Sequence, residues 1–193
     1  MEPDFIYPLT LPPIDERLLP GMRDILLAPS LRSASAEKDV DYLIYDIEEA
    51  VLPEWHRWMG IRWKSLSKFY KNNYTGVIHT DDATNAANSW GINWVCSGYG
   101  NMKYWNKNRL RITVDSQQPT WKSAPFIERY DTDNPPCQEY TLLPGAYLVN
   151  NSIPHLASGY QHRVVLSLRP AHPDNRLPWE NVRSIFKEFI KSN

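Results

Sequence analysis

The amino-acid sequence predicts a mainly β protein with flanking helices, in which antiparallel strands close as a barrel or jelly roll. From residue 74 to residue 170, short segments rich in β-branched and aromatic residues are separated by turn residues, a repetition typical of such folds. Residues 108–116 alternate strictly, with Leu110, Ile112 and Val114 on one face, as in a strand with one side toward water. An amphipathic pattern over residues 176–193 predicts a C-terminal helix that packs on the sheet.

The first 73 residues are predicted to support this core with one strand and one helix. Residues 41–51 carry the β-branched and aromatic side chains of a strand. Apolar residues between 53 and 72 recur near the helical period, which predicts an amphipathic helix. Residues 116–138 contain four prolines and predict a long loop with a short strand near 126–130. A loop of this length inside a compact domain is a candidate lid over a site.

Length and composition predict a single domain over residues 1–193, with residues 74–170 as its β core. The chain has 21 basic and 22 acidic residues without a long block of either sign, which argues against a nucleic-acid or anionic-membrane partner. No apolar run is long enough to span a membrane, and the acidic start lacks the pattern of a signal peptide. We therefore expect a cytoplasmic protein in which Cys96 and Cys137 are reduced thiols.

A candidate metal site begins with His79 and Asp81, where a strand pattern runs into a turn-rich segment. Residues two apart on a strand point to the same side, so the imidazole and the carboxylate can reach one metal ion. A second His-x-Asp pattern, His172 and Asp174, lies in a proline-rich connection and is interpreted as a surface turn. His155 completes the first pattern, because two histidines and one carboxylate on iron(II) leave three positions open for a co-substrate and dioxygen.

A candidate anion-binding residue follows the second histidine. Arg163 lies eight residues beyond His155, at the start of an apolar strand pattern, where its guanidinium can grip a distal carboxylate in a bidentate manner. Ser167 shares a strand face with Arg163 and can add a hydroxyl hydrogen bond.

This order of residues resembles that of the 2-oxoglutarate and iron(II)-dependent dioxygenases, and Pro144-Gly145 before the strand that leads to His155 adds to the match. The resemblance covers roughly residues 74–170. It implies a double-stranded β-helix, iron(II) and 2-oxoglutarate as cofactors, and His79, Asp81 and His155 as metal ligands. It also implies that Arg163 pairs with the 5-carboxylate of the co-substrate, and that dioxygen is used to hydroxylate a small-molecule or peptide substrate, with a preference for a protein side chain.

Several residues have two interpretations. His162 is an alternative distal ligand, although it neighbours Arg163 on a strand and would face the opposite way. Asn93 either contacts the co-substrate, as a polar residue does on this strand in similar proteins, or is an ordinary strand asparagine. Arg169 either binds a carboxylate or ends its strand in solvent, the interpretation we favour. Lys103 is a less favoured substitute for Arg163.

The tryptophans and tyrosine at 90, 94, 104 and 105 are expected in the core or the pocket wall. Two other functions fit the same residues: a cupin-like jelly roll that binds a sugar or carboxylate without oxidising it, and a relative that has lost catalysis. The paired presence of Asp81 and Arg163 favours the oxygenase, because a simple binding protein does not require both.

Overall fold

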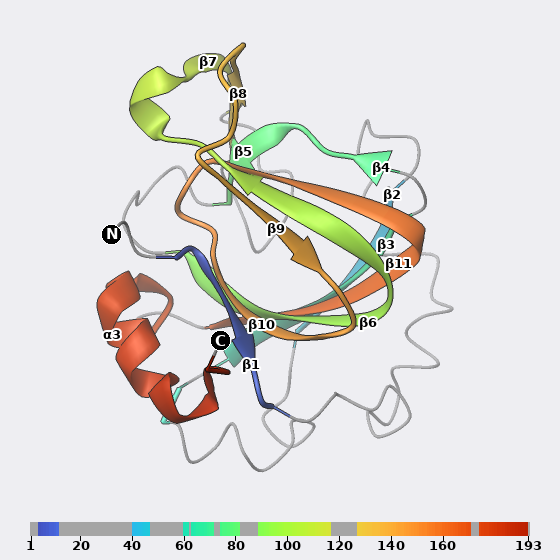
Figure 1. Ribbon diagram of the computed structural model, residues 1–193, viewed down its shortest axis with the longest axis vertical. Coiled ribbons are helices and arrows are strands. Elements are labelled where there is room, and N and C mark those ends of the chain that lie inside the picture. Colours follow the sequence, from blue (N-terminus) through green and yellow to red (C-terminus); the bar gives the residue numbers. More distant parts are fainter. Residues whose placement is uncertain are drawn as a thin grey trace.

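The computed structural model describes residues 4–11, 40–46, 60–61, 63–71, 74–81, 89–116, 127–170 and 174–192. Two long antiparallel strands, β6 (Trp90–Tyr104) and β11 (His155–Pro170), form the centre of the fold (Figure 1). Both strands bend near their middle, where Gly98 and Gln161 have positive φ angles of 65° and 53° and the β6–β11 register shifts. Each long strand therefore takes part in two layers.

The first layer contains the first half of β6 and the second half of β11. Its outer strands are β10 (Gly145–Asn150) and β1 (Ile6–Leu9) beside β6, and β3 (Trp63–Lys71) and β2 (Val40–Asp46) beside β11. The second layer contains the other two halves. Its outer strands are β9 (Gln138–Leu142) beside β6, and β4 (Tyr74–Thr75), β5 (Ile78–Thr80), β8 (Ile127–Asp131) and β7 (Arg111–Ser116) on the side of β11.

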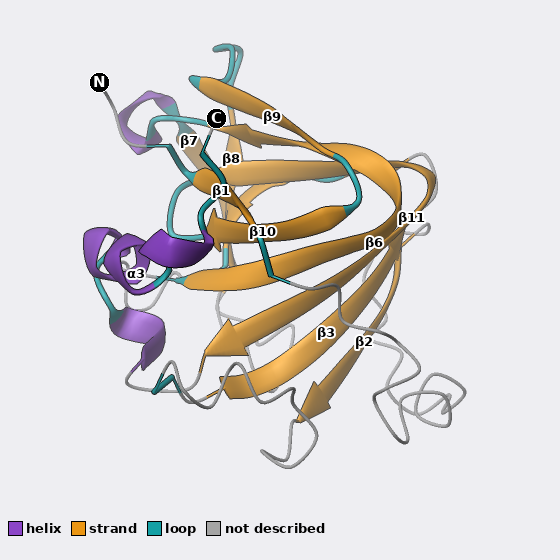
Figure 2. Cartoon of the chain, turned by 60° about the horizontal axis from the view of Figure 1, so that its bottom comes forward, coloured by secondary structure: helices purple, strands orange, loops and turns teal. Residues whose placement is uncertain are grey.

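The layers curl toward each other as a half-open barrel (Figure 2). This confirms the predicted class, a mainly β jelly roll of the double-stranded β-helix type with a flanking helix. The β7–β8 pair projects from one end of the barrel (Figure 1). Ile112 on β7 is 56% exposed, so the apolar face predicted for this strand is not buried there.

Of the two elements predicted in the N-terminal part, the helix differs from the structure and the strand agrees with it. The helix predicted over residues 53–72 is wrong for Trp63–Lys71, which form a strand paired with β2 on one edge and β11 on the other. Backbone pairing along both edges outweighs a weak helical period in the apolar residues. The strand predicted for 41–51 is confirmed at Val40–Asp46. Residues 53–59 and 47–51 lie outside the described parts of the chain.

The predicted C-terminal helix is shorter than residues 176–193. It consists of α3 (Trp179–Ile185), followed by a 3-10 turn at Lys187–Phe189. Within the candidate lid at 116–138, β8 confirms the short strand, while residues 117–126 are not described. Among the described residues, no helix is long and apolar enough to cross a membrane.

Alternation along β11 separates two apolar clusters. Leu166 and Leu168 belong to a cluster that also contains Val182 and Phe186 from the C-terminal segment, so α3 covers the outer face of the first layer. Val165 belongs to a second cluster inside the barrel. Because side chains alternate along a strand, the odd-numbered residues of this part of β11 face the barrel interior.

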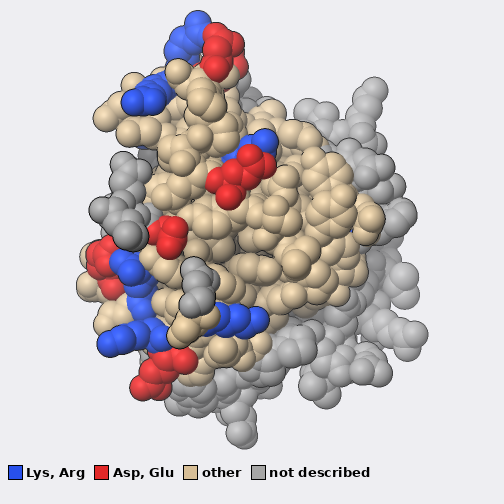
Figure 3. Space-filling view, in the orientation of Figure 1, with Lys and Arg blue, Asp and Glu red and all other residues tan. Residues whose placement is uncertain are grey.

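The described surface carries both signs of charge. In Figure 3, basic and acidic side chains lie together over the β7–β8 end and around α3. Neither sign forms a continuous patch on the face shown, as expected from the near-neutral net charge of -1.

Candidate metal centre

His79, Asp81 and His155 come together at one end of the barrel interior. His79 on β5 and His155 on β11 are directly paired in register, and their ring centroids are 4.5 Å apart. Nε2 of His79 lies 3.2 Å from Oδ1 of Asp81, and Nε2 of His155 lies 3.8 Å from the same oxygen. All three candidate ligand atoms lie within 4.8 Å of one another, so residues from distant parts of the chain point at a common position.

Both imidazoles are oriented by their other nitrogen. Nδ1 of His79 lies 2.9 Å from the carbonyl oxygen of Val77, and Nδ1 of His155 lies 2.9 Å from that of Ile153. A carbonyl oxygen only accepts hydrogen bonds, so each Nδ1 carries a proton and each Nε2 is directed toward Asp81. Metal-binding histidines are commonly oriented in this way.

The electrostatics of the three side chains fit a cation between them. Burial, and secondarily the neighbouring His79, lower the pKa of His155 to about 4, so this imidazole is neutral at pH 7. The Nε2 lone pair of His155 then faces the carboxylate oxygen of Asp81, an arrangement that a positive ion between them would stabilise. Two imidazoles and a carboxylate suit a divalent transition metal.

The second oxygen of Asp81 is held by Arg169, whose Nη2 lies 2.9 Å from Oδ2. With the Asn151 amide turned so that its oxygen faces Arg169, that oxygen accepts from both guanidinium Nη atoms. The backbone N–H of Asp81 donates to the carbonyl of Asn151 at 3.3 Å. Burial alone would raise the pKa of Asp81, but Arg169 and then the His79 hydrogen bond hold it far below its usual value. Asp81 is therefore ionised, with Oδ1 left for a metal.

Arg169 thus corrects one prediction, because its side chain does not end in solvent. It is only 24% exposed and pairs with a candidate metal ligand. Gly91 on β6 makes room for it: a Cβ at Gly91 would lie 3.0 Å from two Arg169 side-chain atoms and 2.8 Å from the carbonyl oxygen of Leu168.

Arg163 lies deeper in the interior and is only 3% exposed. One Nη donates to the carbonyl of Ser158 at 3.1 Å, while Nε has no hydrogen-bond partner. Among the described residues no carboxylate pairs with it. Burial lowers the pKa of Arg163 to about 10, an effect that Tyr147 only partly offsets. A buried guanidinium without a counter-charge is costly, so the site is suited to an anionic ligand.

The Arg163 side chain runs along β6 toward the histidines. A Cβ at Gly98 would lie 2.8 Å from its Cα, and a Cβ at Gly100 would lie 2.9 Å from its Cδ and Nε. The guanidinium is therefore beside Gly100, in the direction of Tyr104, which is the register partner of His155. Only glycine leaves this channel open, because a Cβ at Gly100 would also lie 2.1 Å from the Ser158 oxygen.

Ser167 and Asn93 lie between the two arginine positions. They are register partners on β11 and β6, are 1% and 8% exposed, and face the same interior as Val165 and Val95. Neither Ser167 Oγ nor Asn93 Oδ1 has a hydrogen-bond partner among the described residues. Buried polar atoms are normally paired, so both fit contact with a polar ligand or water.

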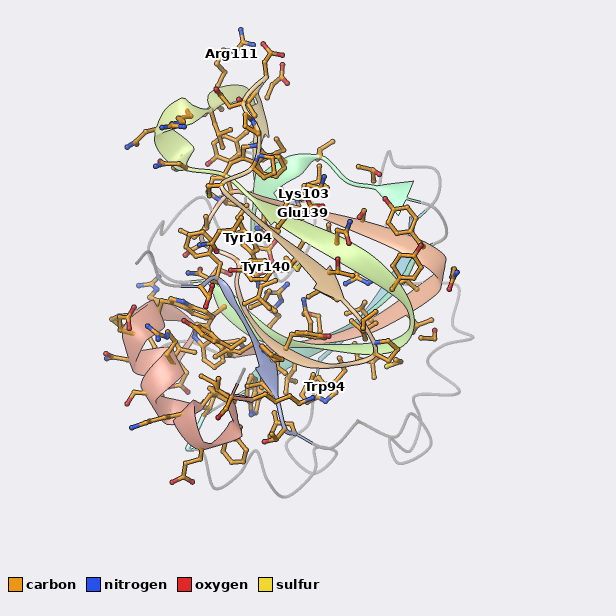
Figure 4. The ribbon with its side chains drawn as sticks, in the orientation of Figure 1. Trp94, Lys103, Tyr104, Arg111, Glu139 and Tyr140 are labelled. Carbon is orange, nitrogen blue, oxygen red and sulfur yellow. The ribbon has the colours of Figure 1, made fainter. Side chains whose placement is uncertain are left out.

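Tyr104, expected from the sequence in the core or the pocket wall, is also a candidate for contact with a ligand. It is fully buried, its ring centroid is 5.8 Å from that of His155, and its hydroxyl has no partner among the described residues. Burial raises the pKa of Tyr104 far above its usual value, so the hydroxyl remains a hydrogen-bond donor. Figure 4 shows Tyr104 beside Tyr140, with which it makes an edge contact at 6.0 Å.

Two alternatives from the sequence resolve differently. Lys103 does not replace Arg163: it pairs with Glu139 across β6 and β9 at 3.3 Å (Figure 4) and is adjacent to the inward-facing Tyr104, so it points outward. The side chain of His162 is not described, but His155 occupies the ligand position itself.

Asp174 of the second His-x-Asp pattern is not one of the converging side chains. It lies in a 3-10 turn, and its backbone carbonyl accepts a hydrogen bond from the indole N–H of Trp90. Cys96 and Cys137 are not joined in a disulfide, in agreement with the expected reduced thiols.

Comparison with known proteins gives only remote similarity. No family model and no curated protein matches the chain. Among solved structures, the coconut allergen cocosin matches with a TM-score of 0.43 and 9% identity over 75% of this chain and 30% of its own. The Escherichia coli ribosomal oxygenase YcfD, in complex with cobalt and 2-oxoglutarate, gives 0.37 and 16% over 64% and 26%. Hydroquinone 1,2-dioxygenase PnpCD gives 0.34 and 12% over 57% and 59%. The chain thus spans less than a third of the first two proteins, and at this similarity none of the three indicates an activity for it.

Proposed function

We propose that the protein is a non-haem iron(II) oxygenase that couples decarboxylation of 2-oxoglutarate to hydroxylation of a substrate. The proposal rests on one observation: metal-binding side chains and an anion-binding side chain face the same interior of the barrel. Two imidazoles and a carboxylate converge at one end, and a buried guanidinium without a carboxylate partner among the described residues lies further in. A metal-binding dicarboxylate satisfies both at once.

The three ligands suit iron(II) because they leave open coordination positions. The two imidazoles and one oxygen of Asp81 would hold the metal, and the coordination positions they leave open would accept the co-substrate and dioxygen. Arg169, itself held by the Asn151 amide, keeps the second carboxylate oxygen occupied, which favours binding of the metal through one oxygen only.

The co-substrate would lie along β6 and β11. Arg163 would grip the distal carboxylate, since a guanidinium donates two parallel hydrogen bonds to a carboxylate. The hydroxyls of Ser167 and Tyr104, which lack partners among the described residues, would add further donors. The apolar residues Val165 and Val95 limit water in the same space, which strengthens each charged contact.

The bound iron and 2-oxoglutarate supply the activation of dioxygen and the oxidation of the substrate, with succinate and carbon dioxide as co-products. The protein contributes ligand geometry, orientation of the co-substrate and exclusion of water. His79 and His155 donate from Nδ1 to backbone carbonyls, which would keep each ring oriented with its Nε2 toward the metal.

Anaerobic titration with iron(II) and then 2-oxoglutarate tests the proposal, followed by succinate measurement after air is admitted. We expect saturable binding of both, loss of iron binding in Asp81→Ala, and loss of 2-oxoglutarate binding in Arg163→Met. Lys103→Met is the matched control, because it also removes a cation from a strand of the barrel but on the outer face. Wild-type iron uptake by Asp81→Ala would contradict the metal assignment. Tight binding of both ligands without succinate would favour the cupin-like binding protein instead.

A further inference from the structure

A pocket of about 190 Å³ opens at the end of β6. It is formed by the residues after Tyr104 and by the loop that leads into β9. Its lining includes Trp105, Asn106, Arg109, Asn134, Pro136 and Cys137. None of these residues belongs to the metal site or to the interior around Arg163.

Two backbone contacts tie this pocket to the metal centre. Trp105 follows Tyr104, and its N–H donates to the carbonyl of Pro154 at 3.0 Å, the residue before His155. The N–H of Cys137 donates to the carbonyl of Tyr104 at 2.8 Å. Consecutive Cα atoms are about 3.8 Å apart. The pocket wall therefore begins one residue along the chain from the residue that is paired with His155.

The pocket is held open by hydrogen bonds at both sides of the loop. The side-chain amide of Asn134 donates to the carbonyl of Arg109 at 3.1 Å, and the Thr132 hydroxyl donates to the same oxygen at 3.3 Å. The Trp105 indole N–H donates to the carbonyl of Asn134 at 2.9 Å. A ligand therefore meets a largely formed site, which lowers the entropic cost of binding.

The lining combines an apolar wall with one cation. The Trp105 ring and the two prolines of the loop form the wall, and Asn106 and Asn134 add amides. Arg109 supplies a guanidinium that makes no ion pair with a described residue. The nearby Arg111 differs, because it lies outside the pocket and faces Asp133 at 3.8 Å.

We propose that this pocket is a subsite for a carboxylate attached to an apolar group, and that it binds the acidic end of the substrate while another part reaches the metal. Its role as a substrate subsite rests on the proposed oxygenase function, but the binding itself does not. The carboxylate would pair with Arg109, and the apolar part would pack on Trp105.

Cys137 offers a direct test, since it lines the pocket and is exposed. The experiment measures its alkylation by iodoacetamide in metal-free protein, site by site by mass spectrometry, with Cys96 as the internal reference. Phenylacetate and phenylacetamide are the probes, because they share an apolar body and differ in charge. We expect phenylacetate to slow alkylation of Cys137 about threefold when it is present at twice its dissociation constant.

The variants distinguish this subsite from other anion sites. Protection by phenylacetate should disappear in Arg109→Gln and persist in Arg111→Gln, while Cys96 reacts equally throughout. The inference is overturned if phenylacetamide protects as well as phenylacetate, if Arg109→Gln keeps the protection, or if neither probe protects. No iron or 2-oxoglutarate is present, so this result and the iron titration can fail independently.

Discussion

Replacement of Arg163 by methionine should stabilise the ligand-free protein. Burial lowers the pKa of Arg163 from 12.5 to about 10, which corresponds to a cost of about 3 kcal/mol for keeping the guanidinium charged. This cost is present at every pH below 10, since the folded protein holds the proton less tightly than the unfolded chain. The variant also loses the hydrogen bond to the Ser158 carbonyl, worth about 1–2 kcal/mol. The expected net gain is about 1–2 kcal/mol, or a rise in Tm of about 2–8 °C.

The same substitution should abolish the stabilising effect of a dicarboxylate. A ligand at 100 times its dissociation constant stabilises the folded state by about 2.7 kcal/mol. Wild-type protein loaded with metal should therefore gain stability from 2-oxoglutarate or succinate, and Arg163→Met should gain none. The variant would then be more stable without ligand and less stable with it, as expected where a functional group is buried at a cost.

Urea unfolding at pH 7, with and without ligand, measures both effects. Arg169→Met is the matched control, because Arg169 pairs with Asp81 at 2.9 Å and is 24% exposed. Its removal should lower the unfolding free energy by about 1–3 kcal/mol, less than for a fully buried pair. If Arg163→Met is less stable than wild type without ligand, the protein itself already stabilises the Arg163 guanidinium. The inference that this side chain binds an anionic ligand would then be wrong.

Two further outcomes follow from the site. Metal-free protein should lose up to about 3 kcal/mol of stability between pH 6.5 and 4, because the pKa of His155 is lowered to about 4 and the unfolded state takes up more protons in this range. Urea unfolding across this range measures the loss, and a flat profile identical to that of His155→Gln would contradict it. Gly100→Ala should destabilise the protein by about 3 kcal/mol or more, because its Cβ would lie 2.1 Å from the Ser158 oxygen. Gly60→Ala, with open space around the Cβ and φ of 67°, should cost only about 1 kcal/mol, and thermal unfolding of both variants decides whether they differ.

The metal ligands could be predicted because the rule that relates them to structure is local. His79 lies on β5 and Asp81 directly follows the end of that strand, so an extended backbone brings the two side chains to one side whatever the rest of the fold is. The structure places His155 beside His79 through the β5–β11 pairing, a contact between residues 76 positions apart. Only the resemblance to a known order of residues connected the two in advance.

Other features depend on irregularities that a periodic pattern does not contain. The bend at Gly98 changes which residues of β6 face inward: Asn93 and Val95 do so before it, and Met102 and Tyr104 do so after it. Simple alternation from Asn93 would place Tyr104 on the outer face, so the period of the strand alone does not predict its position beside His155. The two-sided pairing of β3 is likewise a tertiary effect, which outweighs the helical spacing of its apolar residues.

The charges of the interior imply that metal and co-substrate bind cooperatively. Among the described residues of the interior, two arginines, Arg163 and Arg169, accompany one carboxylate, Asp81, so a divalent ion alone adds to a net positive charge. A bound dicarboxylate offsets that charge, and its effect on metal affinity must equal the effect of metal on its own affinity. We expect 2-oxoglutarate to tighten binding of manganese(II), used as a redox-stable probe, by about tenfold, equivalent to about 1.4 kcal/mol of coupling. Glutarate, which has both carboxylates but lacks the keto group that would chelate the metal, should give only part of this effect. Equal manganese affinity with and without 2-oxoglutarate, measured by calorimetry, would show that the two ligands do not share this interior.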